Sequence, residues 1–219
     1  MRKLLTLLVG IAFLATANLA SALDLKEGKH YKVLNPERPV DAKDKIEITE
    51  FFWYGCGHCF NLEPILNKWL KTLPKDVMFR RIPAVFPGKD GRPGGWAPLA
   101  GVYYALESMG VLEKMHGEVF DAIHIDRVNL NDPKVLADWM AAKGVDRQKF
   151  ADAMNSFSVQ SKVTRAQQLS GQYGFDGVPA IFINGRYGVA SGEAGSHAEM
   201  TVVLDQLIDK ARKERSVKK

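Results

Sequence analysis

The chain has 219 residues, with 30 Lys or Arg against 25 Asp or Glu and a formal net charge of +5. The basic residues are dispersed among acidic ones, which argues against the basic, aromatic-rich face of a nucleic-acid partner. After the N-terminal segment, no stretch is long and apolar enough to span a membrane, so we expect a soluble mature protein.

Residues 1–22 are typical of a secretory signal peptide. Arg2 and Lys3 form a basic start, an apolar run follows from residue 4 to 14, and Ala20-Ser21-Ala22 matches the small residues that signal peptidase cuts. An uncleaved anchor is the alternative, but the run becomes polar before reaching the ~20 apolar residues of a spanning helix. We therefore expect export with cleavage after Ala22.

Residues 45–54 alternate at first between polar and β-branched types and end in aromatics, which predicts a strand whose later half is buried on both faces. Gly55 interrupts it, and from Cys59 apolar residues recur at helical spacing until Pro74. The sequence Cys56-Gly57-His58-Cys59 is therefore expected at a strand-to-helix turn. Residues 31–34 and 77–85 are predicted as further strands.

Cys56 and Cys59 are the two cysteines of the chain. A disulfide between them closes too short a loop to stabilise much, a structural zinc site takes four ligands, and Phe60 stands where attached haem needs His. Redox chemistry is favoured, with a labile structural bond or metal site as the alternatives. The helix start would stabilise a thiolate at Cys56 by ~0.3–1 kcal/mol, and His58, unless it is a plain loop histidine, would add to this.

The segment 87–173 has a different character. A Gly- and Pro-rich loop covers residues 87–95, and helices are predicted near 98–109, 113–126, 133–143, 147–156 and 159–173. We interpret them as an insertion into an α/β domain formed by residues 23–86 and 174–219. The loop with Trp96 is either a hinge or a rim for substrate. The aromatic residues of the insertion are interpreted as packing or surface residues without a ligand role: Trp96, Trp139, His116 and His124.

The chain returns to a strand at Ala180–Ile183, followed by the hairpin signal Asn184-Gly185. A capping box from Ser196 to Glu199 then opens the last helix.

These features resemble the DsbA family of periplasmic thiol:disulfide interchange proteins, within the thioredoxin superfamily. The resemblance runs from Glu27 to about Arg212 and is carried by Glu50-Phe51-Phe52, the cysteine motif, Glu63 and residues 177–185. It implies an α/β, thioredoxin-like fold with an inserted α-helical domain, and a periplasmic location.

The resemblance implies that Cys56 is the nucleophile, Cys59 the resolving cysteine, and Pro179 a cis-proline facing the pair. One group is expected to carry the chemistry: Cys56, Cys59, His58, Pro179 and Glu50. Another is expected to bind substrate: Gly57, Val178 and Glu63. Glu50 and Glu63 also match acidic positions that tune the redox pair. From the sequence alone, Glu50 is either a buried carboxylate without a partner that handles protons or a polar residue at the edge of a half-buried strand.

Gly57 departs from the best-known members, which have proline there, and this leaves the oxidising strength open. By resemblance we expect a thiol:disulfide oxidoreductase that oxidises unfolded or reduced secreted proteins, is reoxidised by a membrane quinone-linked thiol oxidase, and works as a monomer. No metal and no cofactor besides the disulfide are expected. The alternatives are an isomerase or reductase, although the mature residues before Lys45 leave no room for a dimerisation domain, and a chaperone or metal-binding module that needs no reactive Cys56.

Overall fold

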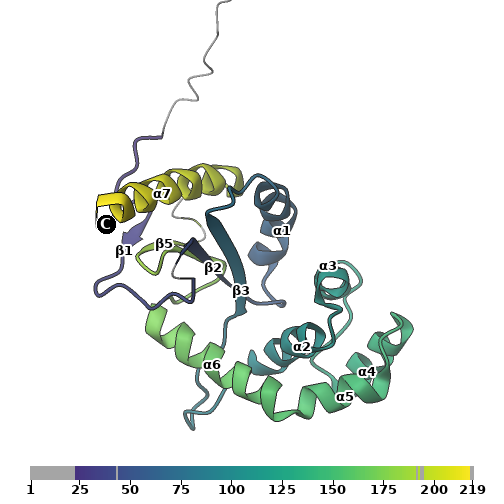
Figure 1. The fold of residues 1–219 in the computed structure, drawn as a ribbon. Helices are drawn as coiled ribbons and strands as arrows, with labels where there is room; N and C mark the ends of the chain where they lie inside the picture. Colours follow the sequence, from purple (N-terminus) through teal and green to yellow (C-terminus); the bar gives the residue numbers. More distant parts are fainter. Residues whose placement is uncertain (1–22, 43, 191, 193–194, 218–219) are drawn as a thin grey trace, which may run out of the picture.

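The computed structural model describes residues 23–42, 44–190, 192 and 195–217, so the expected signal peptide lies outside the described residues. A five-stranded mixed sheet in the order β1-β5-β4-β2-β3 forms the centre of the molecule (Figure 1). The interior strand β2 runs parallel to β3 and antiparallel to β4. The strands are β1 (Lys32–Val33), β2 (Ile46–Phe52), β3 (Val77–Pro83), β4 (Ala180–Ile183) and β5 (Tyr187–Ala190).

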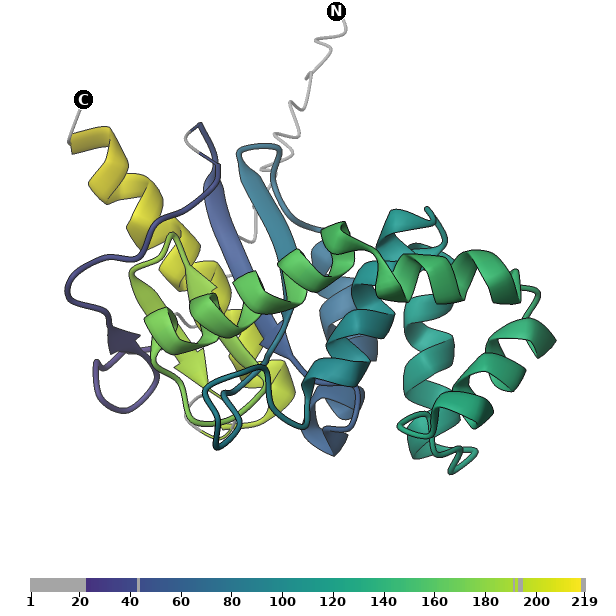
Figure 2. The same cartoon turned by 90° about the horizontal axis from the view of Figure 1, so that it is seen from below.

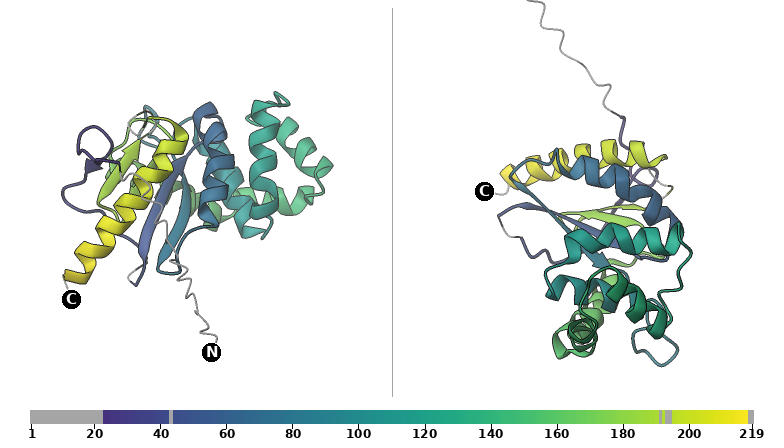
Figure 3. Two further views of the ribbon diagram at one scale, coloured as in Figure 1. Left: turned by 90° about the horizontal axis from the view of Figure 1, so that it is seen from above. Right: turned by 90° about the vertical axis from the view of Figure 1, so that its right-hand side faces the viewer.

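Helices cover both faces of the sheet, as the right-hand view of Figure 3 shows. Helix α1 (Gly57–Leu70) and helix α7 (His197–Val217) lie together on one face, over Ile46 and Ile48 of β2. Helix α2 (Ala97–Ser108) and helix α6 (Phe157–Tyr173) lie on the other face. All seven residues of β2 are therefore buried, which confirms and extends the predicted burial of its later half.

The predicted block of helices lies between β3 and β4 in the chain. Helices α3 (Leu112–His124), α4 (Pro133–Ala142) and α5 (Arg147–Asn155) stand beside the sheet (Figure 2). Asp132 begins α4 by accepting hydrogen bonds from the amides of Lys134 and Val135, as its sequence predicts. In the described part of the chain, none of the helices combines enough length with enough apolar character to span a bilayer.

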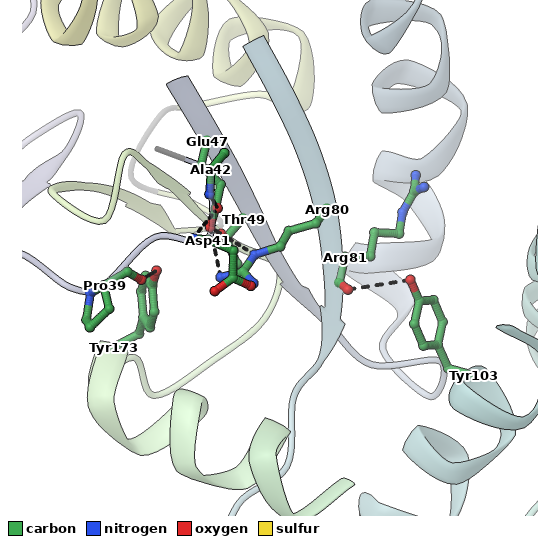
Figure 4. Close-up of polar contacts among 9 residues, drawn as sticks. All are labelled: Pro39, Asp41, Ala42, Glu47, Thr49, Arg80, Arg81, Tyr103 and Tyr173. Atoms are coloured by element: carbon green, nitrogen blue, oxygen red, sulfur yellow. Dashed lines mark hydrogen bonds and ion pairs between the residues drawn. The ribbon is translucent and has the colours of Figure 1, made fainter. Parts of the chain in front are cut away.

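Two consecutive arginines of β3 point to opposite sides of the sheet, as the alternation of a strand requires (Figure 4). Arg80 lies 2.8 Å from Glu47, a fully buried carboxylate of β2. Glu47 also accepts hydrogen bonds from the amides of Asp41 and Ala42, at 2.7 and 2.9 Å. These bonds to the buried Glu47 hold residues 41–42, which lead into β2, against the sheet.

Candidate active site

The redox motif lies where β2 gives way to α1, as predicted. Cys56 is the N-cap of α1, with extended backbone angles, and Gly57 is the first residue of the helix. The Cys56 amide donates to the Trp53 carbonyl at 2.9 Å and closes a turn over residues 53–56. Both cysteines are free thiols; Cys56 is half-buried, whereas Cys59, one helical turn further on, is 1% exposed.

The two thiols have opposite acid–base behaviour. A hydrogen bond from the Cys59 thiol lowers the pKa of Cys56 from an ordinary value of 9.0 to about 6; burial opposes this, and the amides of Cys59 and His58 and the charge of His58 add to it. Burial, with the hydrogen bond to Cys56, raises the pKa of Cys59 far above its usual range. Cys56 is therefore suited to be the thiolate and Cys59 the thiol.

The segment before β4 supplies the opposite side of the site. The Cys56 thiol donates to the carbonyl of Val178 at 3.3 Å, although the two residues are 122 positions apart. The Val178–Pro179 peptide bond is cis, which confirms the expected isomer. A side chain added at Gly57 would meet no atom within 4 Å, so the motif borders open space at Gly57. These positions suit contact with an extended substrate, which stays a prediction for Gly57 and Val178.

Glu50 is buried on the interior strand β2, 1% exposed, so it is not an edge residue. The expectation that it lacks a partner is corrected, because Arg81 Nε lies 3.0 Å from its carboxylate. Neither carboxylate oxygen has a well-aligned hydrogen bond in the structure. Burial raises the pKa of Glu50 to about 8, against the opposing charge of Arg81. When Glu50 is ionised, its negative charge helps to raise the pKa of the Cys59 thiol.

Glu63 on α1 shares Arg81 with Glu50, since Arg81 Nη2 lies 3.1 Å from Glu63. Asn67 donates to the same carboxylate at 2.9 Å. Burial opposes ionisation of Glu63, but the hydrogen bond from His116 and the charge of Arg81 together lower its pKa. Glu63 is buried and pairs with Arg81, which also contacts Glu50; a role in substrate binding stays a prediction.

His116 and His124, two histidines of α3, contact the active site more closely than predicted. His116 is buried and lies between the Tyr54 hydroxyl, at 2.8 Å, and Glu63, at 3.3 Å. His124 Nε2 donates to the Tyr54 carbonyl at 2.8 Å, and its ring stacks on Phe60. Both are packing residues, as expected, but they also bond to the redox turn. No local pattern indicated this, because the partners lie 53 to 70 positions away.

The indole of Trp96 stacks on that of Trp53, at 4.4 Å and 3° between planes. The loop 87–95 is therefore followed directly by a residue that packs on Trp53, the first residue of the redox turn. Within the loop, the Gly88 amide donates to the Arg92 carbonyl and the Gly94 amide to the Phe86 carbonyl, which gives the loop a defined conformation. Trp139 lies in α4, with the Lys143 ammonium over its ring.

In the residues that the structure describes, no group of three or more His, Cys, Asp or Glu is arranged to hold a metal ion.

Comparison with known proteins places this geometry in a family. Residues 47–198 match the model of the DSBA-like thioredoxin domain. The thiol:disulfide interchange protein DsbA of Azotobacter vinelandii is 39% identical over 217 residues, covering 97% of this chain and 99% of the relative. DsbA of Pseudomonas aeruginosa PAO1 is 40% identical over 209 residues, covering 94% and 96%.

Solved structures agree. The crystal structure of Pseudomonas aeruginosa DsbA superposes with a TM-score of 0.81 at 39% identity, covering 88% of this chain and 97% of that chain. The Neisseria meningitidis oxidoreductase NmDsbA1 gives a TM-score of 0.75 at 28% identity, covering 88% and 96%. The expected thioredoxin-like fold with a helical insertion is confirmed. The chain belongs to the DsbA family of thiol:disulfide interchange proteins.

Proposed function

We propose that this thiol:disulfide oxidoreductase donates the Cys56–Cys59 disulfide to newly exported proteins through a mixed disulfide at Cys56. The observation that carries the assignment of roles is the contrast within the pair. Cys56 is half-buried with a pKa lowered to about 6, and Cys59 is buried with a raised pKa. An incoming thiolate can therefore reach the sulfur of Cys56 and not that of Cys59.

The exchange proceeds in two steps. A substrate thiolate attacks Sγ of Cys56, the Cys56–Cys59 bond breaks, and Cys59 leaves with the electron pair and takes up a proton. The second substrate thiolate then attacks the substrate sulfur of the mixed disulfide and expels Cys56 as a thiolate. The substrate loses two electrons and the cysteine pair gains them. The lowered pKa of Cys56 makes it a good leaving group, which favours this second step.

Cys59 needs a proton when it leaves, and we assign its supply to Glu50. Burial raises the pKa of Glu50 to about 8, so Glu50 carries a proton at neutral pH. The carboxylate left after that proton is given up favours the protonated form of Cys59 by its negative charge. Arg81 lies against the Glu50 carboxyl and also pairs with Glu63. His58 supports the Cys56 thiolate through its amide and its charge.

Substrate proteins follow from membership of the family, and its members are periplasmic. We further propose that the signal peptide is cleaved after Ala22, that residues 87–173 form the inserted domain between the two parts of the thioredoxin-like domain, and that the protein works as a monomer. A membrane quinone-linked thiol oxidase would reoxidise the pair. The disulfide would be its only redox group, with no metal and no nucleic acid involved.

Equilibration against glutathione buffers of graded composition tests the function. We expect the pair to be reduced over most of the series, with the disulfide populated only where oxidised glutathione dominates. In parallel, the reduced protein is alkylated at about pH 6 and mapped by peptide analysis, where Cys56 should be labelled first. A pair that stays oxidised in reduced glutathione would identify a reductase or a structural disulfide instead.

Single variants provide the control. Cys59→Ala should retain alkylation at Cys56 and form stable mixed disulfides with a reduced model substrate. Cys56→Ser should form none. Preferential labelling of Cys59 in the unaltered protein would reverse the assignment of the two roles.

A further inference from the structure

Tyr54 is a central residue of the turn that carries Cys56, and helix α3 holds it at two places. The turn spans residues 53–56 and is closed by the Cys56 amide on the Trp53 carbonyl. His116 bonds to the Tyr54 hydroxyl at 2.8 Å and His124 to its carbonyl at 2.8 Å. The orientation of the peptide between Tyr54 and Gly55 is thus fixed from the helical insertion, which lies outside the sheet.

The hydrogen bonds of His116 define its protonation. Glu63 is ionised, since its pKa is lowered, and a carboxylate only accepts, so His116 Nε2–H donates to it at 3.3 Å. Burial lowers the pKa of His116, against the pull of Glu63, so the ring is neutral and Nδ1 accepts from the Tyr54 hydroxyl. One neutral tautomer satisfies both bonds.

The surroundings of the His116 ring leave little freedom for another arrangement. Rings of Phe52, Tyr103 and Phe120 enclose it at 5.2 to 5.9 Å. Glu63 on α1 and Arg81 on β3 are the charges that act on it. The ring is therefore fixed by packing and by hydrogen bonds at both nitrogens. A side chain held in this way can orient a neighbouring functional residue.

We propose that His116 and His124 are positioning residues of the redox site: by holding Tyr54 they keep the amides of His58 and Cys59 aimed at the Cys56 sulfur. This inference rests on the proposed function. Without these contacts the turn gains freedom and the amides stabilise the thiolate less. The Cys56 pKa then rises and the disulfide becomes a weaker oxidant, while the fold is retained.

The test compares variants with the unaltered protein in two measurements, the pH midpoint of Cys56 alkylation and the equilibrium constant with glutathione. His116→Leu and Tyr54→Phe each remove the side-chain bond, and His124→Leu removes the bond to the carbonyl from a half-buried position. Each should shift the equilibrium constant about two- to tenfold toward a weaker oxidant, the effect of one hydrogen bond, with a matching rise of the alkylation midpoint. His116→Gln, which can donate to Glu63 and accept from Tyr54, should restore most of the loss.

A double-mutant cycle separates positioning from general damage. Tyr54→Phe combined with His116→Leu should cost little more than either alone, because both break the same bond. His30→Leu is the matched control: His30 is also buried, but it accepts from the Lys26 amide, and its variant should leave both measurements unchanged.

The inference is overturned if the variants lower the urea midpoints of the oxidised and reduced forms equally and leave the alkylation midpoint unchanged. Should His116→Leu fail to fold, Tyr54→Phe and His124→Leu decide by the same criterion. This inference is decided by how the glutathione equilibrium constant and the alkylation midpoint of each variant differ from those of the unaltered protein. The proposed function is decided by the glutathione equilibrium of the unaltered protein itself, so the two can fail separately.

Discussion

The stability of the reduced protein should depend on pH in a way that the oxidised protein does not share. In the reduced form Cys56 titrates with a pKa lowered from 9.0 to about 6, and in the oxidised form it has no proton to lose. A group with a lowered folded-state pKa contributes stability that is present above its unfolded pKa and lost as the pH falls through the folded value. The unfolding free energy of the reduced form should therefore increase relative to that of the oxidised form as the pH rises from about 5 to about 9.

The magnitude follows from the pKa difference. One pKa unit corresponds to 1.36 kcal/mol, so the change from 9.0 to about 6 would amount to about 4 kcal/mol in a fully shielded site. Because Cys56 is half-buried, solvent screening reduces this to roughly 2 kcal/mol, which equals about 40 mV in a two-electron couple. The disulfide restricts the unfolded chain by about 2 kcal/mol in the opposite sense, but this contribution does not change with pH.

The assay is urea unfolding of both redox forms at about pH 5 and about pH 9, followed by comparison of the two gaps in unfolding free energy. Buried carboxyls such as Glu50 titrate in both forms, so taking the difference removes most of their effect. Reduced Cys56→Ser should lose the extra pH dependence. A gap that is the same at both pH values would refute the reasoning, because the thiolate would then gain nothing from the folded site.

Three further outcomes are expected. Gly57→Pro should raise the unfolding free energy of both redox forms, measured in urea, by ~0.4–1 kcal/mol. Gly57 is the first residue of α1, where proline is favoured, and an added Cβ meets no atom within 4 Å; a lower unfolding free energy would contradict this. Burial raises the pKa of Glu50 to about 8, so the oxidised protein should lose stability as the pH rises from the unfolded value of ~4.3 through about 8. Glu50→Gln should flatten that decline in thermal midpoints, and an unchanged slope would assign it to another group. Glu47→Ala leaves Arg80 without its buried partner and should cost about 3–5 kcal/mol in unfolding free energy, yet leave the glutathione equilibrium unchanged; a shifted equilibrium would mean that this cluster reaches the redox site.

The parts of the site that depend on neighbouring residues could be predicted from the sequence. The cysteine motif falls between a strand and a helix because the apolar spacing changes at Gly55, and this local change determines which thiol is shielded. The sequence predicts a helix start accurately where a capping residue marks it, as at Asp132. The last helix of the insertion begins at Phe157, two residues before the predicted start, because Ser156 caps it and Phe157 is exposed, outside the apolar periodicity.

The charged network under the site could not be predicted, because its partners meet only through the fold. Arg81 pairs with Glu50 across neighbouring strands and with Glu63 on a helix, and nothing in its sequence context distinguishes it from Arg80. His116 has the spacing of a packing residue of α3, and its side chain is indeed buried there. Its bonds to Tyr54 and Glu63 depend on how the insertion docks against the sheet, which periodicity does not describe.

The position of the insertion in the chain also imposes an order on biogenesis. The cysteines leave the ribosome, and later the export channel, well before Val178, whose carbonyl lies against Cys56 from 122 positions further along. Strand β4, which pairs with β2, is equally late, since the five helices of the insertion come first. A nascent chain ending near residue 173 would hold both thiols and no completed sheet around them. Its reactive cysteine would then be exposed to thiols and disulfides in its surroundings, so the site of this catalyst is completed only after β4, β5 and α7 have been added.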